Sequence, residues 1–81
     1  MSAPDMQRAR ELARVSTGDR VRMRGAPGLG TGLVRELSAL NEQGNPCHGF
    51  MRVLVVWPGL DEGRPYDLIV WERSSDLRVM P

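Results

Sequence analysis

The sequence contains no lysine and very few cysteine, histidine or aromatic residues. Its 81 residues include one cysteine, one histidine, two tryptophans, one tyrosine and one phenylalanine. A single cysteine excludes an intrachain disulfide and, with no secretory signal pattern, favours a reducing, cytoplasmic location. A chain of this length makes one small domain of limited stability, which association with a second copy would increase.

Long apolar runs are absent as well. The longest, Val53–Trp57, is far shorter than the roughly 20 residues that a membrane-spanning helix requires. We therefore expect no membrane segment and no membrane partner.

Side chains that could build an enzyme or metal site are too few. Cys47 and His48 are adjacent, and together they fall short of the four ligands of a structural zinc site. An adjacent Cys–His pair also lacks the third group that orients a catalytic base. Gly28–Gly32 resembles a phosphate-binding loop but has neither the lysine nor the following helix of one. The sequence predicts no catalytic residue, no metal and no cofactor.

What the sequence does contain is arginine. All 11 basic residues are arginines, against 10 acids, and the formal net charge is +1. The charge is uneven, because residues 1–24 hold six of the arginines and three of the acids. The planar guanidinium suits phosphate and carboxylate ligands, whereas codon bias is the simpler alternative explanation.

Alternating hydrophobicity predicts an all-β fold of five short strands. The expected strands are Asp19–Arg24, Leu33–Leu37, Phe50–Trp57, Tyr66–Glu72 and Leu77–Met80, with a 3₁₀ turn at Arg73–Asp76. Such strands separated by turn residues are typical of a sandwich or small barrel, here residues 17–81. Residues 1–16 are expected to form either a short N-terminal helix or a flexible arm, because good helix formers follow Asp5.

The strand Phe50–Trp57 is apolar on both faces. Met51, Val53, Val55 and Trp57 alternate with Phe50, Leu54 and Val56. A strand of this kind is covered on both sides, whereas a lone barrel has one interior. The second face therefore requires the N-terminal helix or another subunit, and we expect a homo-oligomer.

Two groups of residues are candidates for binding. The first is Arg20, Arg22 and Arg24 on one face of the first strand, joined by Arg10 and Arg14 from the arm, which could contact successive phosphates of DNA or RNA. The alternative is a solvated face whose arginines pair with Glu36 and Glu72 across the sheet. The second group comprises the aromatic residues Phe50, Trp57, Tyr66 and Trp71, as a stacking pocket or subunit interface, or as ordinary core.

The order of parts resembles an SH3-like small barrel of the KOW/Tudor type. The matching residues are Gly18–Arg22, Gly30–Val34, Arg52–Trp57 and Ser75–Arg78. The resemblance implies a five-stranded SH3-like barrel acting as a non-enzymatic binding or adaptor module. Its implied partner is nucleic acid or a nucleic-acid-processing protein.

A more distant resemblance is to the type II dihydrofolate reductases carried on plasmids and integrons. Gly18–Arg22 and Leu68–Trp71 carry it. Those enzymes line a central tetramer pore with a Val-Gln-Ile-Tyr segment and an upstream lysine. Here Ile69 and Trp71 replace the glutamine and tyrosine, and lysine is absent. The resemblance implies the alternative of a gene-cassette protein on the same scaffold, with a ligand pore at its subunit interface.

Overall fold

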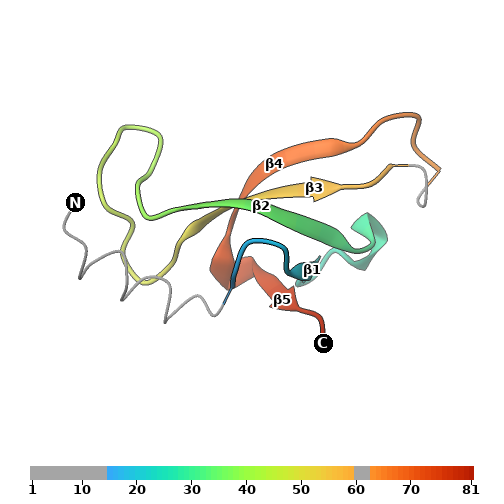
Figure 1. Cartoon of the computed structure of the whole chain (residues 1–81), viewed down its shortest axis with the longest axis horizontal. Coiled ribbons are helices and arrows are strands. Elements are labelled where there is room, and N and C mark those ends of the chain that lie inside the picture. The colour runs from blue at the N-terminus through green and yellow to red at the C-terminus, as the bar shows by residue number, and fades with distance from the viewer. Residues whose placement is uncertain (1–14, 60–62) are drawn as a thin grey trace.

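The computed structural model describes residues 15–59 and 63–81, which form one five-stranded antiparallel sheet (Figure 1). The strands are β1 (Arg20–Met23), β2 (Gly32–Ser38), β3 (Arg52–Trp57), β4 (Leu68–Arg73) and β5 (Leu77–Val79). The predicted all-β, five-stranded fold is confirmed. The predicted helix or arm over residues 1–16 lies almost entirely outside the described residues.

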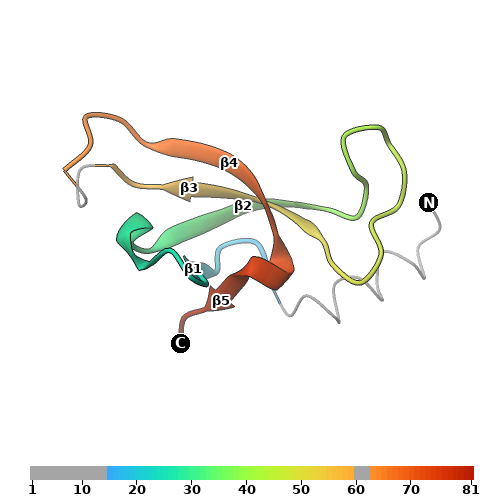
Figure 2. The same cartoon turned by 180° about the vertical axis from the view of Figure 1, so that it is seen from behind.

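The order of strands across the sheet is β4-β3-β2-β1-β5. The last strand pairs with the first, and Met23 lies opposite Leu77. Figures 1 and 2 show the sheet strongly bent, with β4 leading through a short turn directly into β5. The sheet remains open, since β4 and β5 form its two edges, and this architecture is compatible with a small β-barrel.

Two 3₁₀ turns connect strands in the part of the chain that the structure describes. The segment η3 (Ser74–Asp76) is the one that the sequence predicted. The segment η1 (Pro27–Leu29) lies where we expected only a glycine-rich turn, and Pro27 at its first turn supplies a φ suited to it. Gly30 ends η1 at φ 74°, a conformation that favours glycine. Within the described residues, no helix is long and apolar enough to cross a membrane.

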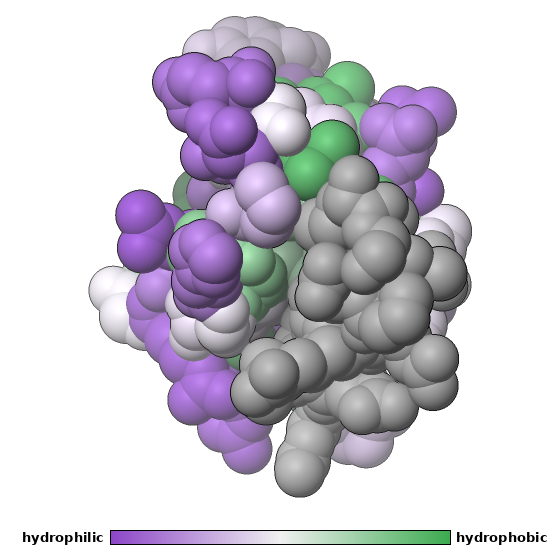
Figure 3. Space-filling view, turned by 90° about the vertical axis from the view of Figure 1, so that its left-hand side faces the viewer, coloured by the Kyte–Doolittle hydropathy of each residue, from purple (hydrophilic) through white to green (hydrophobic). Residues whose placement is uncertain are grey.

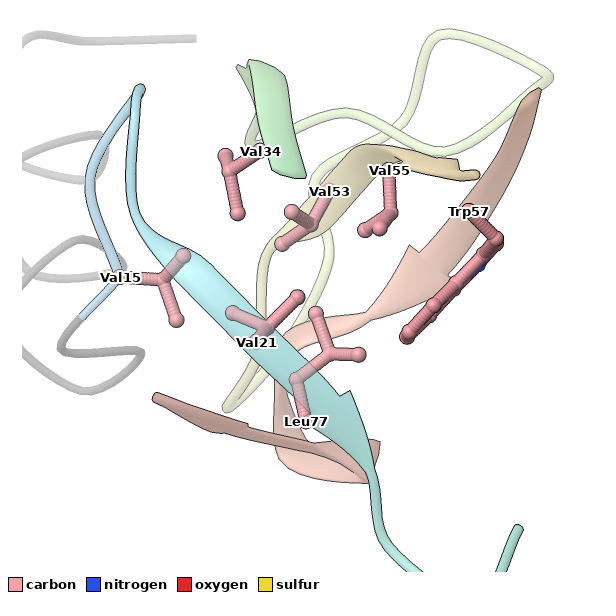
Figure 4. Close-up of a cluster of buried hydrophobic side chains, with 7 residues drawn as sticks. All are labelled: Val15, Val21, Val34, Val53, Val55, Trp57 and Leu77. Carbon is pink, nitrogen blue, oxygen red and sulfur yellow. The ribbon is translucent and has the colours of Figure 1, made fainter. Parts of the chain in front are cut away.

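The core lies on the concave face of the bent sheet. Alternation along β3 places Val53, Val55 and Trp57 inside, each at most 1% exposed. Figure 4 shows these side chains pointing toward those of the neighbouring strands. The full cluster is Val15, Val21, Val34, Val53, Val55, Trp57 and Leu77. Burying a side chain of this size stabilises the fold by about 1.5–3 kcal/mol, so β3 supplies a large part of the stability.

Gly32 allows the indole of Trp57 to reach this core. A Cβ at position 32 would lie 2.8 Å from Cε3 of Trp57 and would also overlap the Val55 side chain. Contacts that close do not occur between carbon atoms, so the strand β2 requires a residue without a side chain here. The sequence indicated close approach of the backbone in Gly28–Gly32, and the structure places it at Gly32.

Candidate functional site

The first candidate group lies on the convex face of β1. Arg20, Arg22 and Arg24 are exposed, whereas Val21 between them is fully buried. Side chains two residues apart on a strand share a face and stand about 6.6 Å apart. The predicted alternation of β1 is therefore confirmed over Arg20–Met23, and Arg24, which follows the strand directly, is exposed as well.

β5 adds a fourth arginine that the sequence analysis missed. Arg78 is exposed and lies directly opposite Arg22 in the β1–β5 register. We name the exposed side chains of Arg20, Arg22, Arg24 and Arg78 the basic face. Arg78 could have been identified from the sequence by pairing the last strand with the first, because alternation then places Arg78 on the same face as Arg22. Like charges at directly opposed positions repel, which an anion bound between them would relieve.

Backbone hydrogen bonds hold the basic face in place. Arg24 N–H donates to the Asp76 carbonyl at 2.7 Å, and Met80 N–H donates to the Arg20 carbonyl at 2.8 Å. The Arg24 guanidinium also donates through Nε to the Leu77 carbonyl at 3.3 Å. These contacts tie both ends of β1 to β5, so the arginines rise from a hydrogen-bonded pair of strands rather than from a loop.

The two acids proposed as cross-strand partners of these arginines lie elsewhere in the sheet. Glu36 faces Leu54 and Glu72 faces Val53 in the register. The residue opposite Arg20 is Leu33. Neither acid therefore lies directly opposite one of these arginines, and their pairing across the sheet stays an alternative prediction. Arg10 and Arg14, the other two members of the predicted group, lie outside the described residues.

The four aromatic residues do not come together. Trp57 is 1% exposed and belongs to the core, where its indole N–H has no acceptor among the described residues. Tyr66 is exposed and precedes β4. Phe50 and Trp71 alone share a pocket. The sequence could not separate these roles, because both tryptophans stand in apolar strands and only the register shows which face each occupies.

The pocket shared by Phe50 and Trp71 has a volume of about 250 Å³ and lies beside the loop that connects β2 to β3. Its remaining lining residues are Asn41, Glu42, Gln43, Cys47, Arg52, Glu72 and Arg73. Figure 3 looks onto this end of the molecule, where hydrophobic residues are visible between hydrophilic ones.

Both aromatic rings in the pocket are already engaged by arginines. The guanidinium of Arg52 lies 4.6 Å from the Trp71 ring centroid, and that of Arg73 lies 4.9 Å from the Phe50 ring centroid. Such cation–π contacts are worth about 0.5–1 kcal/mol at exposed sites. These rings are therefore occupied by the protein's own cations, which is not the arrangement of an empty aromatic cage.

One carboxyl group in this region, that of Glu72, has a pKa above its ordinary value. Burial raises the pKa of Glu72, and the negative charge of Asp76 raises that pKa further. Glu72 lies on the inner side of β4, opposite the fully buried Val53. A carboxylate at the rim of the core is destabilised by losing water, and no basic side chain is its cross-strand neighbour.

Nothing in the described part of the chain gathers metal ligands. Residues 15–59 and 63–81 contain no group of three or more His, Cys, Asp or Glu side chains placed to hold a metal ion. Cys47 is half-buried in the pocket wall, and its N–H donates to the Ala39 carbonyl at 2.8 Å, whereas His48 is exposed.

Comparison with known protein families, with curated proteins and with solved structures found no match. The KOW/Tudor and type II reductase resemblances therefore remain predictions from short sequence motifs.

Proposed function

We propose that this protein is a non-enzymatic binding module whose basic face contacts the phosphates of a nucleic acid. The observation that carries the proposal is the opposition of Arg22 and Arg78 in the β1–β5 register, with Arg20 in the same strand and Arg24 directly after it. Guanidinium groups bind phosphate oxygens in a bidentate manner, and several in a row follow a polyanion better than a single small anion.

The composition of the basic face predicts contact without base specificity. Its side chains are all arginines on a convex sheet surface, and neither β1 nor β5 carries an aromatic residue on which bases could stack. Phosphate contacts fix position but carry no sequence information. We expect the module to tolerate many sequences and to depend strongly on salt. A nucleic-acid-processing protein with an acidic surface would use the same arginines, and it is the other partner that the basic face suits.

Binding of a labelled oligonucleotide, followed by fluorescence anisotropy at low and at physiological salt, tests the proposal. Duplex DNA, single-stranded DNA and single-stranded RNA are compared. We expect saturable binding at low salt that weakens steeply as salt rises, because each phosphate contact releases counterions. An absence of binding to all three at low salt would contradict the nucleic-acid proposal.

The second candidate is a gene-cassette protein on the reductase scaffold, with a ligand pore between subunits. The observation that favours it is the exposure of Ile69 and Trp71 on β4, where the resemblance places pore-lining residues. A tetramer that binds a planar ligand such as dihydrofolate in a saturable manner would support this candidate. A monomer or dimer that binds no such ligand would contradict it.

A further inference from the structure

The two edges of the sheet differ in how well they are protected from pairing with another chain. β5 is three residues long and is followed by Met80 and Pro81. β4 is six residues long, pairs within the described residues with β3 alone, and contains neither a proline nor a bulge in its register. A long, regular, apolar edge strand offers unpaired N–H and C=O groups to a further strand. β4 is the edge that is open to partners.

β4 exposes apolar side chains on both of its faces. Ile69 is 56% exposed and Trp71 is 38% exposed on the convex face, and Val70 is 40% exposed on the concave face. The apolar surface continues into the sheet, because Val56 and Leu33 follow Ile69 across β3 and β2. Contiguous apolar surface at a sheet edge marks an interaction site more often than a solvated face.

From this edge we infer that two copies of the chain associate through antiparallel pairing of their β4 strands, with the two-fold axis at Val70. Facing residues on antiparallel strands point to the same side of the sheet, so a symmetric pair must be centred on a residue. Centring on Val70 places Ile69 of each copy opposite Trp71 of the other. The apolar rows of the two copies then join across the new strand pair.

Charge complementarity selects this register. Within one copy, Arg73 lies directly opposite Arg52, an unfavourable like-charge pair. In the Val70-centred dimer the other neighbour of Arg73 is Asp67 of the second copy, which offsets the repulsion. One Asp67 carboxylate oxygen accepts the Gly59 N–H at 2.9 Å, and that bond anchors the acid at the start of β4.

The neighbouring registers are poorer. A dimer centred on Ile69 would set Trp71 against Asp67, and one centred on Trp71 would set Arg73 against Ile69. Both lose the charge pair and bring a charged group against an apolar side chain. The Val70-centred register has one unfavourable type of facing pair, on the concave face, where the apolar Leu68 of one copy lies opposite the acidic Glu72 of the other. This inference is independent of the proposed function, because β4 and the basic face lie at opposite edges of the sheet.

The test measures the dimer dissociation constant of the full chain by sedimentation equilibrium for four proteins. These are the wild type, Arg73→Asp, Asp67→Arg and the control Arg35→Asp. Arg35 is exposed and is the extra residue at the β2 bulge, two strands away from the edge. Each charge reversal at positions 73 or 67 creates two like-charge contacts in a symmetric dimer. We expect each to raise the dissociation constant at least ~tenfold, and the control to leave it within about threefold.

The decisive experiment mixes the two charge-reversed variants and measures whether they associate with each other. A heterodimer of Arg73→Asp with Asp67→Arg has opposite charges at both contacts, so an equimolar mixture is expected to recover wild-type association. A third variant, Ile69→Asp, keeps both native charges and removes the central apolar contact. It is expected to be monomeric and folded, with an unfolding temperature that does not depend on protein concentration, because Ile69 is exposed in the single copy and its loss removes only the association. A monomeric wild type, or a mixture that fails to associate more tightly than its components, would overturn the inference.

Discussion

Ser74 is bound to Met51 by two hydrogen bonds, so that the turn after β4 is tied to the start of β3. The Ser74 N–H donates to the Met51 carbonyl at 2.8 Å, and the Met51 N–H donates to Ser74 Oγ at 2.9 Å. Both residues are buried, with Met51 fully so and Ser74 at 5% exposure. This pair fixes the point at which the chain leaves β4 and turns toward β5.

Replacing Ser74 with alanine is expected to destabilise the fold by about 1–3 kcal/mol, because a buried backbone N–H is left without an acceptor. Chemical denaturation followed by tryptophan fluorescence measures the change. Ser75→Ala, one residue further in the same turn and exposed, is the matched control and should change the free energy of unfolding by less than about 0.5 kcal/mol. Equal effects of the two substitutions would show that the double hydrogen bond is unimportant.

Gly32→Ala tests the packing of Trp57 beneath β2. The added methyl group would overlap the indole and Val55, so we expect a loss of about 1–3 kcal/mol from overpacking, together with a shift in Trp57 fluorescence. Gly28→Ala is the control, since a Cβ there meets nothing within 4 Å and its φ is not positive. If Gly32→Ala is as stable as Gly28→Ala, Trp57 does not pack against β2 as described.

Glu72→Gln is expected to stabilise the protein at neutral pH. Because burial and the charge of Asp76 raise the pKa of Glu72 in the folded state, the folded chain binds more protons than the unfolded chain between the ordinary and the raised pKa. The free energy of unfolding therefore falls as pH rises through that window. Thermal unfolding at several pH values should show this decline in the wild type and a smaller decline in Glu72→Gln. Glu36→Gln on the exposed convex face serves as the control, and an identical pH profile for Glu72→Gln and wild type would contradict the account.

The fold was largely predictable because the strands alternate. The alternation of Arg20–Met23 shows which side chains face inward, and the predicted bounds of every strand lie within two residues of the observed ones. The open edge at β4 was not predictable. It depends on β4 having no strand partner besides β3 within the described residues, a long-range choice that local patterns do not encode.

The candidate site was predictable only in part. The arginines of β1 were found from alternation alone, whereas Arg78 required the register of β5. Trp57 and Trp71 look alike in the sequence, each at or near the end of an apolar strand, yet one is buried in the core and the other is exposed. Which face a strand residue occupies is set by the partners of the strand, and those become known only with the fold.

A dimer paired through β4 would carry its two basic faces at the far ends of one continuous sheet. In that case an oligonucleotide long enough to reach both faces should bind more tightly than a short one, whereas Ile69→Asp should bind both equally. Anisotropy titrations with short and long oligonucleotides would measure the difference. Equal affinity of the wild type for both lengths would mean that the two basic faces do not act together.

The salt dependence of nucleic-acid binding tests the central claim most directly. The logarithm of the binding constant of the wild type for duplex DNA, plotted against the logarithm of salt concentration, is compared with that of the triple variant Arg20→Gln/Arg22→Gln/Arg78→Gln and of the control Arg35→Gln. Each lost phosphate contact should reduce the slope by about 0.9, so the triple variant is expected to lose close to three such increments while the control keeps the wild-type slope. A triple variant with the wild-type slope would contradict the assignment of the basic face as the nucleic-acid interface.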